Sequence, residues 1–149
     1  MSKHQREKQN DEKNTFVLYL DMDSDDAHVL VSERGISMND KMCGLFTVKG
    51  KIVFEEKKSE NRSIYLCCDI CSREESIISG GKKLPILRKL DISADGSVNM
   101  DLNKVLWLDT SDSLLRSANL FLRNSAGERP SVSSCHLNCT ILLFKKWNT

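Results

Sequence analysis

The chain has 149 residues, of which 40% are hydrophobic and 29% are charged, values that suit one ordinary globular domain. Its 22 basic and 21 acidic residues give a net charge of +1, which argues against a protein built mainly to bind phosphate backbones or anionic lipid. The sequence has neither the apolar core of a signal peptide nor an apolar run approaching the roughly 20 residues of a membrane span. We therefore expect a cytoplasmic or nuclear protein that has no membrane partner.

Residues 1–14 form a polar segment of mixed charge whose one apolar residue is Met1. Such a segment cannot bury enough apolar surface to fold by itself. We therefore expect a disordered tail at 1–14, followed by a single β-sandwich domain at 15–149.

From Thr15 onward, short runs of β-branched, aliphatic and aromatic residues alternate with turn residues, which is the pattern of strands. The runs are TFVLYLDM, AHVLVSE, LFTV, KIVF, SIYLCCDI, LPILRKLDIS, SVNMDL, KVLWLD, NLFL and CTILLF. Lys49-Gly50 predicts a tight hairpin, and Asp95-Gly96 predicts another with the strongest signal in the chain. The segment SDSLLRSAN is the best helix candidate, with Ser111 or Asp112 as its cap. Residues 123–134 are expected to form a long mobile loop.

Strands that alternated with full helices would predict a parallel α/β sheet, and the sequence lacks that alternation. We therefore expect an all-β fold, namely an antiparallel sandwich or barrel of about eight to nine short strands.

Two cysteine clusters raise the question of a metal site. Cys68 and Cys71 have the spacing of a zinc knuckle, and Cys135, His136 or Cys139 would supply further ligands. A knuckle needs a tight turn, and the stretch SIYLCCDICS contains neither Gly nor Pro. We predict structural thiols, no metal and no cofactor, with zinc and a redox disulfide as the alternatives.

Strand alternation assigns each cysteine to a face. Cys68 shares a face with apolar neighbours, whereas Cys67 and Cys71 are placed on the opposite face beside Asp69. In the second cluster, Cys135 and Cys139 lie on a wholly apolar face with Leu137, Ile141 and Leu143, while His136 lies on the other face. Cysteine behaves as a small hydrophobe when buried, so we expect the apolar faces to be core. If Cys67 and Cys71 are exposed, they are the thiols to examine for reactivity.

Two short acidic motifs resemble those of enzymes. Asp21 and Asp23 follow an apolar run, as in the Asp-x-Asp motif of the haloacid-dehalogenase-like phosphatases, a resemblance that implies a parallel α/β sheet. Asp109, Thr110 and Ser111 resemble the Asp-Thr-Ser/Gly loop of the aspartic proteases, which implies a flap and a second structural motif in the remaining chain. Neither context is present in the sequence, and a short motif needs its context. We therefore assign no catalytic residue and expect a protein that is not an enzyme.

The leading hypothesis is a non-catalytic intracellular protein-interaction module, an adaptor or complex subunit, that binds through edge strands or end loops. The candidate loops are 21–26, 76–83 and 123–134. One alternative is a barrel that binds nucleic acid or another anion through the basic regions 49–58 and 82–89. A further alternative is a leaderless secreted factor with a β-trefoil-like fold, although no threefold repeat supports it. The oligomeric state stays open at this stage.

Overall fold

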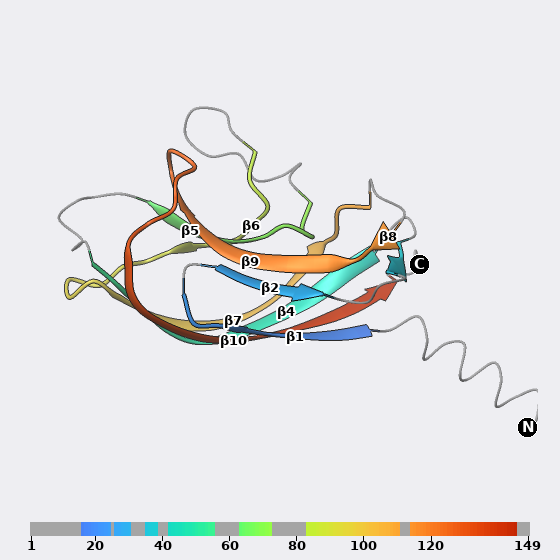
Figure 1. Cartoon of the computed structure of the whole chain (residues 1–149), viewed down its shortest axis with the longest axis horizontal. Coiled ribbons are helices and arrows are strands. Elements are labelled where there is room, and N and C mark those ends of the chain that lie inside the picture. Colours follow the sequence, from blue (N-terminus) through green and yellow to red (C-terminus); the bar gives the residue numbers. More distant parts are fainter. Residues whose placement is uncertain are drawn as a thin grey trace, which may run out of the picture.

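Two antiparallel sheets of four strands each lie face to face in the computed structural model of the chain (Figure 1). The structure describes residues 16–24, 26–30, 35–38, 42–55, 63–72, 83–110 and 114–145. The segment 1–14, expected to be a disordered tail, lies outside these residues. Within them, no helix is long and apolar enough to cross a membrane.

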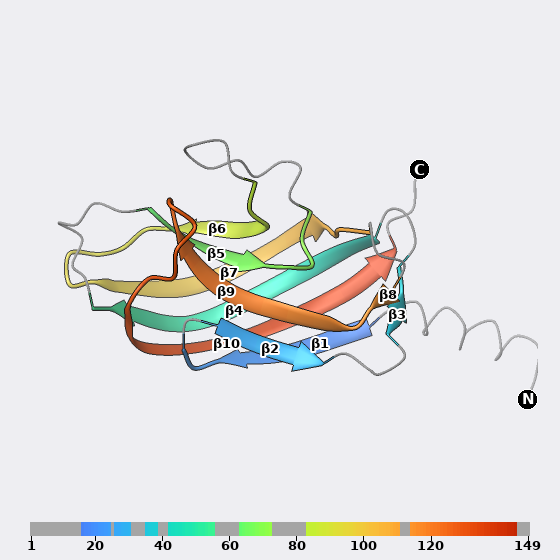
Figure 2. The same ribbon diagram turned by 45° about the horizontal axis from the view of Figure 1, so that its top comes forward.

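Sheet A has the strand order β1-β10-β4-β7, and sheet B has the order β2-β9-β5-β6. The strands of sheet A are β1 (Phe16–Met22), β10 (Val132–Lys145), β4 (Met42–Phe54) and β7 (Ser97–Trp107). The strands of sheet B are β2 (Asp26–Leu30), β9 (Ser117–Asn124), β5 (Ile64–Cys68) and β6 (Ile86–Leu90). A two-residue pairing of β3 (Ile36–Ser37) with β8 (Leu114–Leu115) lies at one end of the sandwich (Figure 2).

Consecutive long strands mostly belong to opposite sheets, and only β5 and β6 follow each other within one sheet. This strand order is that of a jelly roll, an antiparallel sandwich of two interleaved four-stranded sheets. The predicted all-β sandwich is therefore confirmed. The barrel and β-trefoil alternatives do not fit, because no hydrogen-bonded ladder joins the two sheets among the described strands.

The core lies between the sheets, where alternate residues of each strand point inward. On β10 the five inward side chains are each exposed by 2% or less, as the sequence predicted, whereas the side chain of His136 between them is 82% exposed. The five are Cys135, Leu137, Cys139, Ile141 and Leu143. Phe46 on β4 is completely buried opposite sheet B. Burying each large apolar side chain of this kind stabilises the fold by about 1.5–3 kcal/mol.

Lys49-Gly50 lies inside a continuous strand, so the hairpin predicted there is wrong. Gly50 pairs with Leu137 of β10 on one side and with Met100 of β7 on the other, and both ladders continue past it. Its φ of +143° is open to glycine but not to other residues. LFTV and KIVF are therefore two halves of one strand, because two neighbouring strands hold the backbone straight through this point.

Asp95-Gly96 does form a turn, but the predicted hairpin is wrong. β6 before the turn pairs with β5 in sheet B, whereas β7 after the turn pairs with β4 in sheet A. Asp95 and Gly96, the latter with a φ of +84°, thus carry the chain from one layer to the other. Turn residues predict a change of direction, but they do not decide which strand becomes the neighbour.

The carboxylate of Asp95 is the centre of this turn. Its Oδ1 accepts hydrogen bonds from Ser93 Oγ, from Ser97 Oγ at 2.7 Å and from Ser97 N at 3.1 Å. These bonds, first the one from Ser93 and then those from Ser97, lower the pKa of Asp95 to about 2. Hydrogen bonds to the charged form favour that form over the protonated one.

We expect the Asp95 turn to make folding stability fall in acid. Because the pKa in the folded state lies below the ordinary aspartate value of about 3.9, the contribution is complete above that value and is lost as the pH falls toward 2. Urea unfolding of the parent and of Asp95→Asn at several pH values tests this. The parent should lose more stability than the variant between pH 5 and pH 2, and parallel curves would contradict the expectation.

The segment expected to be a helix is extended instead. Leu114 and Leu115 form β8, and β9 follows from Ser117, while Ser111 and Asp112 lie outside the described residues. In β9 every second side chain is buried, including Ala118 and Leu120 at 0% exposure. Pairing with β2 and β5 therefore overrides the weak helical preference of this sequence.

The loop expected at 123–134 is shorter than predicted and is held by hydrogen bonds. β9 ends at Asn124 and β10 begins at Val132. The buried Oδ1 of Asn124 accepts hydrogen bonds from the amides of Ala126 and Glu128, both at 2.9 Å, and Asn124 N donates to the Glu128 carbonyl at 2.8 Å. Asn124 therefore folds most of this connection onto the end of its own strand.

Candidate functional site

The face of sheet A that points away from sheet B, called here the outer face of sheet A, has apolar side chains in successive rows. In the first row, Cys43 pairs with Phe144 on one side and with Trp107 on the other. In the second row, four register partners cross the whole sheet: Val17, Leu142, Leu45 and Val105. Tyr19 begins the third row, which continues through Thr140, Thr47 and Asn103.

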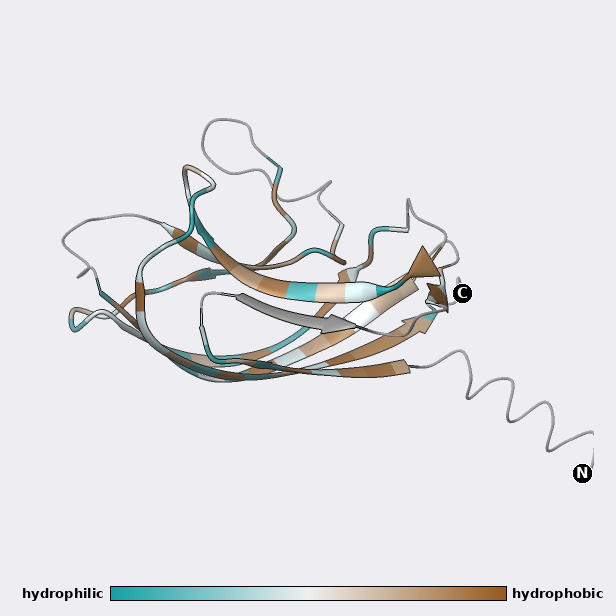
Figure 3. Ribbon diagram, viewed as in Figure 1, coloured by the Kyte–Doolittle hydropathy of each residue, from teal (hydrophilic) through white to brown (hydrophobic). Residues whose placement is uncertain are grey.

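We call this region the apolar end of the outer face. It consists of Val17, Tyr19, Cys43, Leu45, Val105, Trp107, Leu142 and Phe144. Cross-strand partners on one face of a sheet lie about 5 Å apart, so their side chains form a continuous surface. Figure 3 shows the hydrophobic character of β1 and β10 concentrated toward this end of the sheet.

Much of the apolar end is exposed to water. Tyr19 is 72% exposed, Val105 51%, Val17 44% and Trp107 41%. Within the described residues only one other large hydrophobic side chain, Leu114, is comparably exposed, so four of these five lie on this face. Scattered exposed hydrophobic residues are normal, but a contiguous patch marks an interaction surface.

The opposite half of the same face is polar and carries both signs of charge. One row crosses the sheet through Asp21, Asn138, Lys49 and Asp101. Beyond it, the imidazole Nδ1 of His136 lies 3.7 Å from Asp23 Oδ1, with both side chains at least 80% exposed. Exposed pairs of this kind contribute little to stability. The contrast between the two halves shows that the apolar end is a local feature of this sheet.

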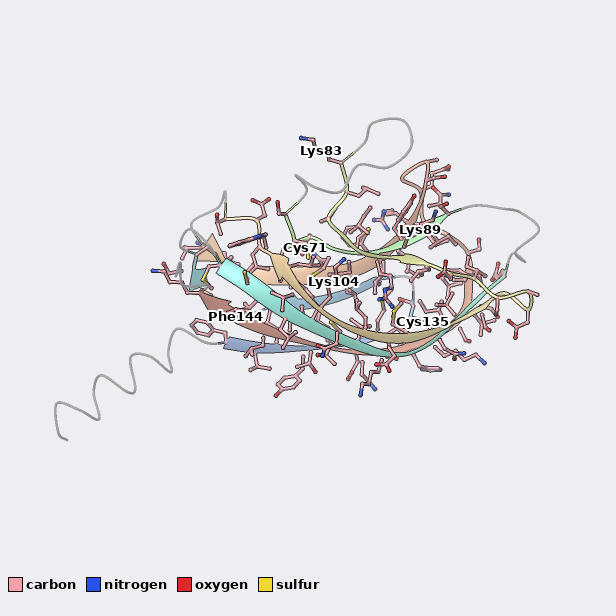
Figure 4. The ribbon with its side chains drawn as sticks, turned by 180° about the vertical axis from the view of Figure 1, so that it is seen from behind. Cys71, Lys83, Lys89, Lys104, Cys135 and Phe144 are labelled. Atoms are coloured by element: carbon pink, nitrogen blue, oxygen red, sulfur yellow. The ribbon has the colours of Figure 1, made fainter. Side chains whose placement is uncertain are left out.

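The outer face of sheet B has a different character. Tyr65 pairs with Arg123 on one side and with Lys89 on the other, and the guanidinium of Arg123 lies 4.6 Å from the ring centroid of Phe121. Figure 4 shows Lys83 and Lys89 on this side of the molecule and Phe144 on the side of sheet A. The basic regions proposed for anion binding are thus split, since Lys49 lies on sheet A opposite Asp101.

Cys68 and Cys71 lie together, contrary to the prediction that they point in opposite directions. β5 ends at Cys68, and Asp69 and Ile70 form a turn in which Cys71 N donates to the Cys68 carbonyl at 3.0 Å. Both side chains belong to the core. Strand alternation fails here because the strand is two residues shorter than the apolar pattern, and the turn forms without Gly or Pro.

The turn is held from both sides. Asp69 Oδ1 accepts from Asn119 N at 2.8 Å, Oδ2 accepts from Asn119 Nδ2 at 2.6 Å, and Asp69 N donates to the Asn119 carbonyl at 3.1 Å. Beyond the turn, Cys71 pairs with Leu108 next to the end of β7. The segment therefore crosses from sheet B to the edge of sheet A.

Cys71 and Cys139 are poor nucleophiles. None of the six cysteines forms a disulfide and all six are buried, which answers the question of exposure for Cys67 and Cys71. A hydrogen bond with Cys68, together with burial, raises the pKa of Cys71 well above its ordinary value. Burial raises the pKa of Cys139 to about 12. Because the thiolate is the reactive form, these two thiols are protonated and unreactive at neutral pH.

The remaining motif residues do not assemble into a site. Within the described ranges, no group of three or more His, Cys, Asp and Glu side chains is placed to hold a metal ion. Cys135 and Cys139 face the core, whereas His136 points to solvent on the other face of β10. Asp21 is exposed on β1, and Asp109 follows β7, where its amide donates to the Ile70 carbonyl at 2.8 Å.

The sequence did not predict that the residues of the apolar end form one surface. The signal was present in part, because Leu142 and Phe144 alternate with core residues of β10 at positions where polar residues are expected on an exposed face. Register was the missing information. Only the pairing of β10 with β1 and β4, and of β4 with β7, shows that these side chains form one surface.

Comparison with known proteins adds no functional assignment. No protein-family model and no curated protein matches the chain. One solved structure with some resemblance is a chain of Bacillus endospore appendages, described as disulfide-linked pili. It is 5% identical, the match covers 89% of this chain and 88% of that chain, and the TM-score is 0.30. Similarity this low supports no argument about function.

Proposed function

We propose that this protein is a non-catalytic protein-interaction module that binds an apolar protein surface through the apolar end of its outer face. The observation that carries this proposal is the cross-sheet row Val17, Leu142, Leu45 and Val105, on a face that no other described element covers. Keeping such a row in water is unfavourable by about 25 cal/mol for each Å² of apolar surface. A protein partner removes that cost.

The composition of the apolar end supports a protein as its partner. Trp107 and Tyr19 belong to the residue types that dominate binding energy in protein interfaces. The threonine and asparagine side chains of the third row form a polar border on one side of the apolar end, and Thr47 Oγ1 donates to Asn103 Oδ1 at 3.3 Å. An apolar centre with a polar rim is the usual anatomy of such an interface.

The proposal moves the binding surface from loops to a sheet face. Of the loops considered from the sequence, residues 76–82 lie outside the described residues, and 124–128 are bound to their own strand by Asn124. We propose a cytoplasmic or nuclear location as well, which six buried cysteines that form no disulfide support, because disulfides are rare in those compartments.

Replacing Tyr19 by Ser and Val105 by Thr together should weaken partner binding without unfolding the protein, because both side chains are largely exposed. Asn99→Thr is the matched control, since Asn99 is exposed on the same face of β7 in its polar half. The tagged full chain is purified from its native cells, and the protein that accompanies it stoichiometrically is identified. Its affinity for each purified variant is then measured by calorimetry.

We expect the double variant to weaken binding at least about 30-fold, or about 2 kcal/mol, the loss typical of a single hot spot. Asn99→Thr should bind like the parent. Equal affinity for the parent and the double variant would refute the proposed binding face.

A further inference from the structure

We propose that the partner of the apolar end is a further copy of this chain, so that the outer faces of sheet A pack against one another in a homo-oligomer. This inference rests on the proposed function, because it names the occupant of the same face.

The apolar end is suited to packing of sheet against sheet. Its second row reaches from edge strand β1 to edge strand β7, so the apolar surface occupies the full width of the sheet. On the central strand β4, Cys43 is only 1% exposed, whereas Tyr19 and Val105 on the two edge strands are 72% and 51% exposed. Sheets pack about 10 Å apart when their side chains interdigitate. Two copies that are offset across the sheet can therefore place the exposed edge residues of one over the central strands of the other.

The charges on the outer face do not select a partner of opposite charge. The polar half carries Asp21, Asp23 and Asp101 together with Lys49, Lys51 and His136, so acidic and basic groups are interspersed on it. The apolar end itself contains no charged side chain. A face that carries both signs of charge can pair with a face of the same composition, whereas a uniformly acidic or basic partner would meet like charges on it.

The whole chain carries a net charge of +1, so copies of it repel one another very little. Proteins near zero net charge associate more readily than highly charged ones. In an oligomer with a two-fold axis, the interface at that axis uses the same patch on both copies. A symmetry axis through the apolar end brings the apolar residues of the copies together and leaves the polar halves in water.

Sedimentation equilibrium of the full chain, at concentrations from about 1 to 100 µM, tests the inference. The chain mass is 16.9 kDa, and we expect the parent to sediment as a closed oligomer of two or more chains. In the variant Tyr19→Ser/Val105→Thr, the dissociation constant of the oligomer should rise at least about 100-fold, because two exposed anchors are lost. Asn99→Thr should sediment like the parent.

Circular dichroism spectra and urea unfolding curves of the variants separate loss of association from loss of folding. If the double variant does not fold, Tyr19→Ser alone replaces it, since Tyr19 is the most exposed residue of the group. A parent that sediments at 16.9 kDa throughout overturns the inference. An oligomer that is equally stable in the parent and in the folded variants also overturns it.

The two proposals fail in distinguishable ways. A monomeric parent whose stoichiometric partner from native cells is lost with Tyr19→Ser/Val105→Thr contradicts self-association but supports the interaction face. A monomeric parent whose partner is retained by that variant contradicts both. An oligomer that the variant disrupts supports both.

Discussion

Gly50→Ala is expected to destabilise the protein by about 3 kcal/mol or more, and at that size it removes a large part of the folding free energy of an average domain. A Cβ at this position would lie 1.9 Å from the carbonyl oxygen of His136, in the backbone of the neighbouring strand. The φ of +143° is in addition strained for any residue that has a side chain.

The clash at Gly50 cannot be relieved by a small local shift of the backbone. β4 is paired on both sides at this point, with Leu137 of β10 and Met100 of β7, so neither the glycine nor His136 can shift without breaking a ladder. Urea unfolding of the parent and the variant measures the loss. A variant that is too unstable to purify would be consistent with the upper part of the range.

Gly44→Ala is the matched control, because it adds the same methyl group to the same strand. There the nearest atom to a new Cβ is Cε1 of Phe46 at 2.8 Å, which belongs to a side chain, and the backbone conformation is an ordinary one. Overpacking of this kind typically costs about 1–3 kcal/mol. If Gly44→Ala destabilised the protein more than Gly50→Ala, the argument from backbone geometry would be wrong.

Asp69→Ala should cost about 2–3 kcal/mol and should also open the Cys68–Cys71 turn. The carboxylate accepts two hydrogen bonds from Asn119, and hydrogen bonds to charged groups are worth about 1.5–3 kcal/mol. Their removal leaves the backbone amide of Asn119 without this acceptor. Because the same turn keeps Cys71 in the core, we expect Cys71 to react faster with a thiol reagent in the variant.

Asp69→Asn is the control for this second prediction, since it keeps one oxygen that can accept from the Asn119 amide. We expect its loss of stability and its rate of labelling to lie between those of the parent and Asp69→Ala. Urea unfolding gives the stability, and mass spectrometry after timed exposure to the reagent gives the rate at each cysteine. Parent-like labelling of Cys71 in a destabilised Asp69→Ala would show that the turn does not protect the thiol.

The contrast between the two cysteine clusters shows where sequence reasoning succeeds. On β10 the alternation of Cys135 and Cys139 with polar residues extends over a long strand, so the face of each residue follows from its position in the sequence. At Cys71 the same reasoning fails, because β5 ends three residues earlier. Strand ends depend on where partner strands stop, and the sequence of β5 contains no information about the length of β9.

The sequence by itself determined the class of fold, the core face of β10 and the position of the turn at Asp95-Gly96, because all three depend on neighbouring residues in the chain. Which strands become neighbours was decided only by the tertiary structure, since burial of both sheets at once selects one strand order among many. The continuous β4 through Gly50, the Asp69–Asn119 contact and the apolar end all follow from that order. Tyr19 and Trp107 are 88 positions apart (107 − 19) in the sequence, and only the register of four strands places them on one face.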